Sequence, residues 1–242
     1  RICIFGAGAI GGYLAAALDI AGADVSLVAR GPHLDSIRTD GLKFEKDGAI
    51  TTHHLQASNM PAELGPQDIV FLAVKAHGIP SVVDDLKPLL HANTIIVPAV
   101  NGLPWWYFHC AGTGTSLDEQ PLLSVDPQSR IWNEIGPQRA IGCVVYPACD
   151  IAAPGHVRHL DGDRFSLGEP SGEKSERVRA LSALMIEGGL KAPLRPRIRD
   201  EIWIKLWGNC SFNPISALTG ATLDAIGNDP ETRQLAAETM QE

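Results

Sequence analysis

Residues 1–12 read RICIFGAGAIGG, a short apolar run followed at once by a glycine-rich turn. In the pattern GxGxxG, the first glycine permits a tight turn, the second lets a pyrophosphate approach the backbone, and the third allows a helix to pack closely on a sheet. N–H groups at the start of that helix can then bind phosphate. The stretch therefore predicts a dinucleotide-binding loop, with a ligand-free glycine turn as the alternative. The loop residues are Gly6, Ala7, Gly8, Ala9, Ile10 and Gly11.

Short apolar segments alternate with helix-like segments along most of the chain. The run DIVFLAVK (68–75) is apolar almost throughout, as expected for a strand buried on both faces of a parallel sheet. The pair Asp47-Gly48 is typical of a hairpin turn between two strand-like runs. The remaining expected strands are 1–5, 24–30, 94–102, 140–148, 157–160, 164–168 and 191–196. The expected helices of this part are 10–22, 79–90 and 175–190.

This alternation is typical of a doubly wound α/β sheet. We predict an α/β fold in which residues 1–197 form an N-terminal Rossmann-type, NADP-binding domain. Residues 198–242 are expected to begin an all-helical C-terminal domain for substrate binding or dimerisation, with an interruption near Pro214.

Residues 103–138 fit no regular pattern. They contain the run WWYF, a GTGTS stretch and several prolines. We expect a helix start followed by an inserted loop. Trp105 and Trp106 either fill a core or subunit contact, or reshape a ligand pocket.

Composition excludes several classes of function. The chain has 242 residues and a formal charge of −8, so no global basic field would attract nucleic acid or an anionic membrane. No apolar run approaches the length of about 18–20 residues that a membrane span needs, and the N-terminus does not resemble a signal peptide. The five cysteines form no CxxC pair and the histidines show no ligand spacing, so we expect reduced thiols, a cytoplasmic location and no metal.

The end of the second strand indicates which dinucleotide is preferred. NAD-binding domains usually place an acidic residue there to accept a hydrogen bond from the ribose 2′-hydroxyl. This chain has Arg30 instead, and a guanidinium can bind a 2′-phosphate through two hydrogen bonds. Asp24 and Asp35 are near in sequence but do not end the strand. The sequence favours NADP(H) over NAD(H), with a solvated Arg30 as the alternative.

Two more polar residues end expected strands. Lys75 ends 68–75, and Asn101, followed by Gly102, ends 94–102. Ligands of open α/β sheets bind beyond the carboxyl ends of the strands, so both side chains are expected near the glycine loop. A solvated lysine and a simple Asn-Gly turn are the alternatives.

The segment 201–214, EIWIKLWGNCSFNP, combines bulky apolar side chains with polar ones. Lys205, Asn209 and Asn213 recur every four residues, so on a helix they share one broad stripe. The apolar remainder predicts a buried helix, in which unpaired polar groups would cost about 1–3 kcal/mol each. These polar groups could find hydrogen-bond partners in an internal network that includes Glu201, or in a ligand bound in a cleft between two domains.

Together with the glycine loop, Lys75 and Asn101-Gly102, the stretch 205-KLWGNCSFNPISAL-218 resembles the ketopantoate reductase (2-dehydropantoate 2-reductase) family. The resemblance covers essentially the whole chain. It implies NADPH-dependent reduction of 2-dehydropantoate to pantoate, a step toward pantothenate and coenzyme A, by a monomer or homodimer. It also implies further helices beyond Glu242.

Site roles follow from this resemblance. It makes Lys205 the proton donor and assigns substrate binding to Asn101, Asn209 and Asn213. Cofactor contacts are implied for the glycine loop, Arg30, Lys75, Asn101 and Ala148. An apolar environment lowers the pKa of a lysine and so favours proton release near neutral pH. Another 2-oxoacid as substrate and a non-catalytic, dinucleotide-binding regulatory protein are the alternatives.

Overall fold

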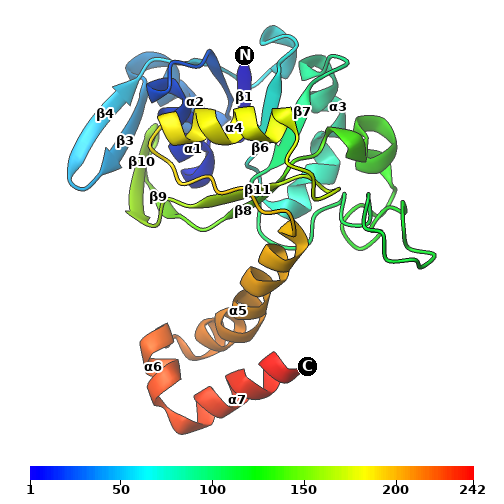
Figure 1. The fold of residues 1–242 in the computed structure, drawn as a ribbon. Helices are drawn as coiled ribbons and strands as arrows, with labels where there is room; N and C mark the ends of the chain where they lie inside the picture. The colour runs from blue at the N-terminus through cyan, green and yellow to red at the C-terminus, as the bar shows by residue number, and fades with distance from the viewer. The chain divides into compact units, whose positions relative to one another are not determined.

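A computed structural model describes all residues, Arg1–Glu242. It divides into two compact units, Arg1–Ile198 and Arg199–Glu242 (Figure 1). None of its helices combines the length and apolarity that crossing a bilayer requires.

The first unit is built on a five-stranded sheet in the order β5-β2-β1-β6-β7, and every neighbouring pair is parallel. The order reverses at β1, which pairs with β2 on one side and β6 on the other, so the switch point where such folds bind ligands lies beside β1. The predicted Rossmann-type sheet is confirmed. Its strands are β1 (Ile2–Phe5), β2 (Val25–Val28), β5 (Gln56–Ser58), β6 (Ile69–Leu72) and β7 (Ile95–Pro98).

The helices of this unit are α1 (Ala9–Ile20), α2 (Gly31–Asp40), the short α3 (Val83–Leu86) and α4 (Glu176–Glu187). The sequence analysis missed α2, whose polar composition carries little helical periodicity. The helix expected over 79–90 is mostly 3-10 in character, at Ala76–Val82 and Lys87–Leu89 around α3. Pro80 and Pro88 explain this, because each lacks the N–H that a regular α-helix would use.

A second sheet has the order β4-β3-β10-β9. The predicted hairpin is confirmed: β3 (Leu42–Lys46) and β4 (Ala49–His53) are antiparallel, and Asp47 and Gly48 have φ of 52° and 78°. Both lie in the left-handed region that such turns require. Figure 1 shows this hairpin at one side of the unit. The other strands of the second sheet are β9 (Ala148–Ala153) and β10 (His156–Asp161).

A two-stranded sheet completes the first unit, with β8 (Gly142–Val145) antiparallel to β11 (Phe165–Gly168). The strand expected over 191–196 is reduced to isolated bridges, Arg164 to Lys191 and Leu167 to Leu194. This segment contains Pro193 and Pro196, which cannot donate to a continuous ladder.

Residues 103–138 form turns, one π-helical turn at Ile131–Ile135 and a 3-10 turn that begins at Pro137. Trp105 and Trp106 are only 1% and 0% exposed, so these aromatic side chains fill core. A Cβ at Gly142 would lie 2.8 Å from the Trp106 ring, which shows how closely this core packs against β8.

The second unit contains α5 (Ile198–Thr219, which begins at the boundary), α6 (Leu223–Asn228) and α7 (Pro230–Gln241). Its small core joins Ile215, Ile226 and Ala236. The interruption expected near Pro214 is absent, because α5 continues through it. The expectation of a buried helix is also wrong for Trp203, Ile204 and Trp207, which are 50%, 62% and 53% exposed, because this core involves a later part of α5.

Candidate functional site

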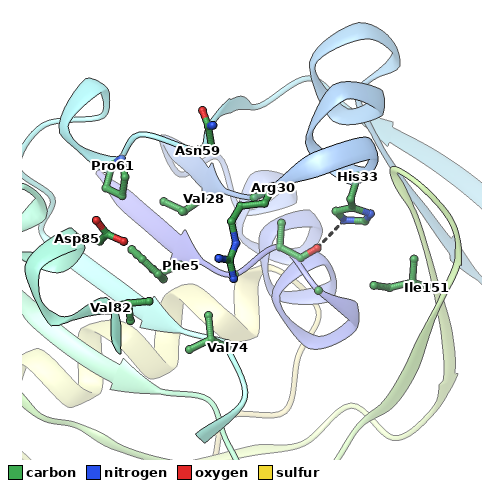
Figure 2. A pocket seen from close by; sticks show the side chains of 14 residues that line it. Phe5, Val28, Arg30, His33, Asn59, Pro61, Val74, Val82, Asp85 and Ile151 are labelled. Atoms are coloured by element: carbon green, nitrogen blue, oxygen red, sulfur yellow. Dashed lines mark hydrogen bonds between the residues drawn. The ribbon is translucent and has the colours of Figure 1, made fainter. Parts of the chain in front are cut away.

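A pocket of about 220 Å³ opens at the carboxyl ends of β1 and β2 (Figure 2). The switch point of the sheet places it there, where the chain leaves one strand for the glycine loop and the other for α2. Its lining is mostly apolar or backbone, with a few polar side chains. The lining residues are Phe5, Gly6, Ala7, Gly8, Val28, Ala29, Arg30, His33, Asn59, Pro61, Val74, Val82, Asp85 and Ile151.

The three glycines of the loop differ in what surrounds them. Gly6 has φ of +105°, and a Cβ there would lie 2.9 Å from Val74 Cγ1. A Cβ on Gly11 would lie 2.0 Å from the Gly6 carbonyl oxygen, so α1 can approach the strand only without a side chain. A Cβ on Gly8 would meet nothing within 4 Å, and Gly8 lines the pocket. These surroundings match the separate roles expected of glycines in this motif.

The loop is held in place by backbone hydrogen bonds. The N–H groups of Gly6 and Ala7 both donate to the Val28 carbonyl, at 3.0 and 3.1 Å. Gly8 is the N-cap of α1 and offers no side-chain acceptor to the first turn. A helix start of this kind favours an anion, because its N–H groups carry partial positive charge.

Arg30 and Asp85 supply the formal charges of the pocket lining. Arg30 is exposed at the N-cap of α2, and Figure 2 shows its side chain extending into the pocket. Asp85 comes from α3, and its side chain also faces the pocket in this view. The site therefore offers a guanidinium near the end of β2, as expected, and a carboxylate that the sequence analysis did not single out.

His33 is a second residue that the sequence analysis missed. Its Nε2 lies 2.6 Å from the Ala7 carbonyl oxygen, the dashed contact in Figure 2. Its Nδ1 accepts a hydrogen bond of 3.0 Å from the Gly155 N–H. Nε2 therefore carries the hydrogen and donates to Ala7. Only the tertiary contact with Gly155 shows this role. The sequence carries no signal for it, because a single histidine in a polar segment fits no motif.

The other candidate residues of the first unit lie outside this lining. Lys75 is exposed after β6, at the start of the turn Ala76–Val82, and Asn101 is exposed beyond the end of β7. Both follow adjacent strands at the same edge of the sheet. Ala148 is exposed at the first position of β9. Ala9, Ile10 and Gly11 form the first turn of α1.

Lys205, Asn209 and Asn213 all lie on α5, in the second unit, and their spacing of four places them on one stripe of the helix. Lys205 and Asn209 are partly buried, and Asn213 is exposed. Their assigned roles stay predictions.

Comparison with known proteins gives matches along the chain. The family described as ketopantoate reductase PanE/ApbA matches residues 2–172, and its C-terminal counterpart matches residues 197–242. A 2-dehydropantoate 2-reductase from Mesorhizobium japonicum is 56% identical over 243 residues, covering 100% of this chain and 74% of the relative.

The chain is also similar to solved structures that carry these names. A candidate ketopantoate reductase from Ralstonia solanacearum MolK2 is 44% identical with a TM-score of 0.94, over 100% of this chain and 74% of that one. A 2-dehydropantoate 2-reductase from Geobacter metallireducens GS-15 is 28% identical with a TM-score of 0.84, over 100% of this chain and 73% of that one.

Proposed function

The chain belongs to the ketopantoate reductase PanE/ApbA family, as the resemblance in its sequence indicated, and from that premise we propose that it reduces 2-dehydropantoate to pantoate with NADPH. Membership makes the chain an oxidoreductase. The observation that carries the proposal is the pocket where the glycine loop and Arg30 meet at the carboxyl ends of β1 and β2.

The cofactor assignment is supported by the lining of this pocket. The loop provides a helix start for a pyrophosphate, and open space at Gly8 lets it approach the backbone. Arg30 would bind a 2′-phosphate, which a carboxylate at the end of β2 would repel. When bound, the nicotinamide supplies the hydride, while the chain's own residues bind it and handle the proton.

We assign the role of proton donor to Lys205. Hydride addition to a ketone carbon leaves negative charge on the oxygen, and a nearby ammonium group stabilises that charge and then donates a proton. Asn209 and Asn213 recur on the same helix at intervals of four, so their amides would orient the carboxylate and hydroxyl groups of the oxoacid without adding charge. We propose that the first domain binds the cofactor and that residues from 198 onward contribute to substrate binding or dimerisation.

A turnover assay tests this function. The chain is incubated with NADPH, NADH and a panel of 2-oxoacids while cofactor absorbance is followed. We expect oxidation that depends on 2-dehydropantoate and is much slower with NADH. Turnover of a different 2-oxoacid alone would reassign the substrate, and cofactor binding without any turnover would favour a regulatory protein.

The variant Lys205→Ala tests the proton donor separately. Loss of a positioned acid should lower kcat by roughly 10²–10⁴-fold while leaving the Kd for NADPH nearly unchanged. Lys174→Ala, at an exposed position in the first unit, is the control and should keep full activity. An equal loss of turnover and NADPH binding in Lys205→Ala would indicate a structural role for this lysine.

A further inference from the structure

Three side chains of different chemistry meet in the segment 109–119. His109 Nδ1 lies 2.7 Å from Glu119 Oε2, and Cys110 Sγ lies 3.9 Å from the same nitrogen and 3.6 Å from Nε2 of the ring. One ligand atom from each residue lies within 4.8 Å of the others. We propose that His109, Cys110 and Glu119 form a binding site for a divalent cation of the zinc class, separate from the dinucleotide pocket.

Backbone contacts hold the Glu119 carboxylate beside Cys110. The Cys110 N–H donates to Glu119 Oε1 at 2.6 Å, and the Glu119 N–H donates to the Phe108 carbonyl at 3.0 Å. Asp118 holds the loop that joins Cys110 to Glu119, because its carboxylate accepts hydrogen bonds from the N–H groups of Thr113 and Gly114. The Glu119 carboxylate is therefore held beside Cys110 before a metal arrives, which lowers the cost of ordering this ligand.

The imidazole is fixed by the core beneath it. The backbone N–H of His109 donates to the Trp106 carbonyl at 2.8 Å, and Trp106 is fully buried. The His109 ring also meets the Trp132 ring edge-on, with centroids 6.2 Å apart and an interplanar angle of 85°. This histidine side chain is only 19% exposed, so its ring has little freedom to turn away from the cysteine and the glutamate.

The ligand set selects the class of metal. A thiolate and an imidazole favour zinc and similar transition metals over Mg²⁺ and Ca²⁺, which prefer oxygen ligands. In a tetrahedral zinc site, nitrogen and sulfur ligands are separated by roughly 3.5 Å, given bonds of about 2.0 and 2.3 Å. Cys110 Sγ lies 3.9 Å from His109 Nδ1 and 3.6 Å from Nε2, beside the ring, so the cysteine side chain must rotate toward Nδ1 to share a metal with Glu119. Binding releases the Cys110 proton and replaces the hydrogen bond between His109 and Glu119 with two metal bonds.

Three protein ligands leave one position of a tetrahedral metal open. His109 and Cys110 also line a pocket of about 210 Å³. Glu169 and Arg177 also line this pocket, and Glu169 is only 4% exposed. Two nitrogens of the Arg177 guanidinium donate to the Glu169 carboxylate at 2.7 and 2.6 Å, so the positive charge of Arg177 is already paired. The open position has room for water or a small ligand, and Arg177 leaves no unbalanced positive charge to oppose the cation.

A cobalt titration tests the site. The full chain is treated with a chelator, and Co²⁺ is added while the absorption of a cobalt–thiolate bond is recorded. We expect one equivalent to bind with this absorption and Zn²⁺ to displace it. The Cys110→Ser variant should lose the absorption, whereas Cys210→Ser, which removes another exposed cysteine, should keep it.

Affinity and thiol protection give independent measurements. Mutating a residue that only hydrogen-bonds to a metal ligand weakens metal binding by roughly 10–100-fold. Removing a ligand itself should cost at least as much, so Glu119→Gln should raise the Kd for Zn²⁺ by about that factor or more. Bound Zn²⁺ should also slow alkylation of Cys110 but not of Cys210. Circular dichroism establishes that each variant is folded. Absorption that is missing in the wild type, or that persists in Cys110→Ser, would overturn the proposal.

Discussion

The Nε2 of His33 lies 2.6 Å from the carbonyl oxygen of Ala7, so a side chain of α2 is bonded directly to the glycine loop. The same imidazole accepts a hydrogen bond from Gly155, which precedes β10. One neutral histidine thus joins the loop, α2 and the second sheet. Because the loop is expected to hold phosphate, this contact should affect affinity for the cofactor.

We predict that His33→Ala weakens NADPH binding by about 3- to 10-fold, which corresponds to the roughly 0.5–1.5 kcal/mol that a hydrogen bond contributes. Titration of NADPH fluorescence measures the effect. His54→Ala, an exposed histidine outside the pocket lining, is the control. Unchanged affinity in His33→Ala would mean that backbone bonds from Gly6 and Ala7 to Val28 are enough to hold the loop.

Gly8 and Gly11 form a matched pair for separating binding from folding. A Cβ at Gly8 enters open space, whereas a Cβ at Gly11 would lie 2.0 Å from the Gly6 carbonyl oxygen. Gly8→Ala should therefore keep the wild-type free energy of unfolding but lose cofactor affinity. Gly11→Ala should lower the free energy of unfolding by about 1–3 kcal/mol or more, as overpacking does.

Urea unfolding and NADPH titration on the same samples separate the two effects. If both variants lost stability equally, glycine at position 8 would be required for folding and not only for the approach of a ligand. A Gly8→Ala protein that still bound NADPH with wild-type affinity would show that the cofactor does not approach the backbone at this position.

The parts of the molecule that follow local rules were predictable from sequence. The strand 1–5, the GxGxxG turn and the Asp47-Gly48 hairpin each depend on neighbouring residues, and the structure has all of them. The short 3-10 turns between Ala76 and Leu89 were not anticipated, because a helix was expected over 79–90, although Pro80 and Pro88 each remove a backbone donor.

Contacts between distant residues could not be predicted in this way. His33 meets Gly155 across 122 positions, and no pattern in one sequence connects them. The cluster of His109, Cys110 and Glu119 follows no known ligand spacing, so the sequence analysis predicted no metal. In each case the turn geometry of the folded chain, rather than residue spacing, brings the groups together.

Arg30 and Asp85 line the same pocket with opposite charges, which makes them a test of cofactor choice. Arg30→Ala should raise the Kd for NADPH by about 10- to 100-fold, since charged hydrogen bonds contribute roughly 1.5–3 kcal/mol, and should leave the Kd for NADH unchanged. Arg30→Lys should recover only part of the affinity, because an ammonium cannot form two parallel hydrogen bonds to a phosphate.

Asp85→Asn is the companion variant. If Asp85 binds ribose hydroxyl groups, this change should weaken both cofactors; if it only repels phosphate, NADPH should bind more tightly. Isothermal titration with each cofactor distinguishes these results. An Arg30→Ala protein that binds both cofactors as the wild type does would remove the basis for preferring NADP(H).

None of the five cysteines forms a disulfide, and their reactivity should follow their burial. Burial raises the pKa of the Cys3 thiol from 9.0 to about 12 and that of Cys149 from 9.0 to about 11. The thiolate is the reactive form, and at pH 8 only about one Cys3 side chain in ten thousand would be a thiolate. Cys110 and Cys210 are exposed and should react first.

A short pulse of iodoacetamide at pH 8, on chelator-treated protein, should label Cys110 and Cys210, as peptide mass spectrometry can establish. Raising the pH to 9 should speed their labelling, since more of each exposed thiol becomes thiolate, while Cys3 stays unlabelled because its raised pKa still lies well above that pH. In urea all five should react. Rapid labelling of Cys3 in the native protein would mean that β1 opens frequently, and the glycine loop that follows β1 would then lack the rigid support that cofactor binding requires.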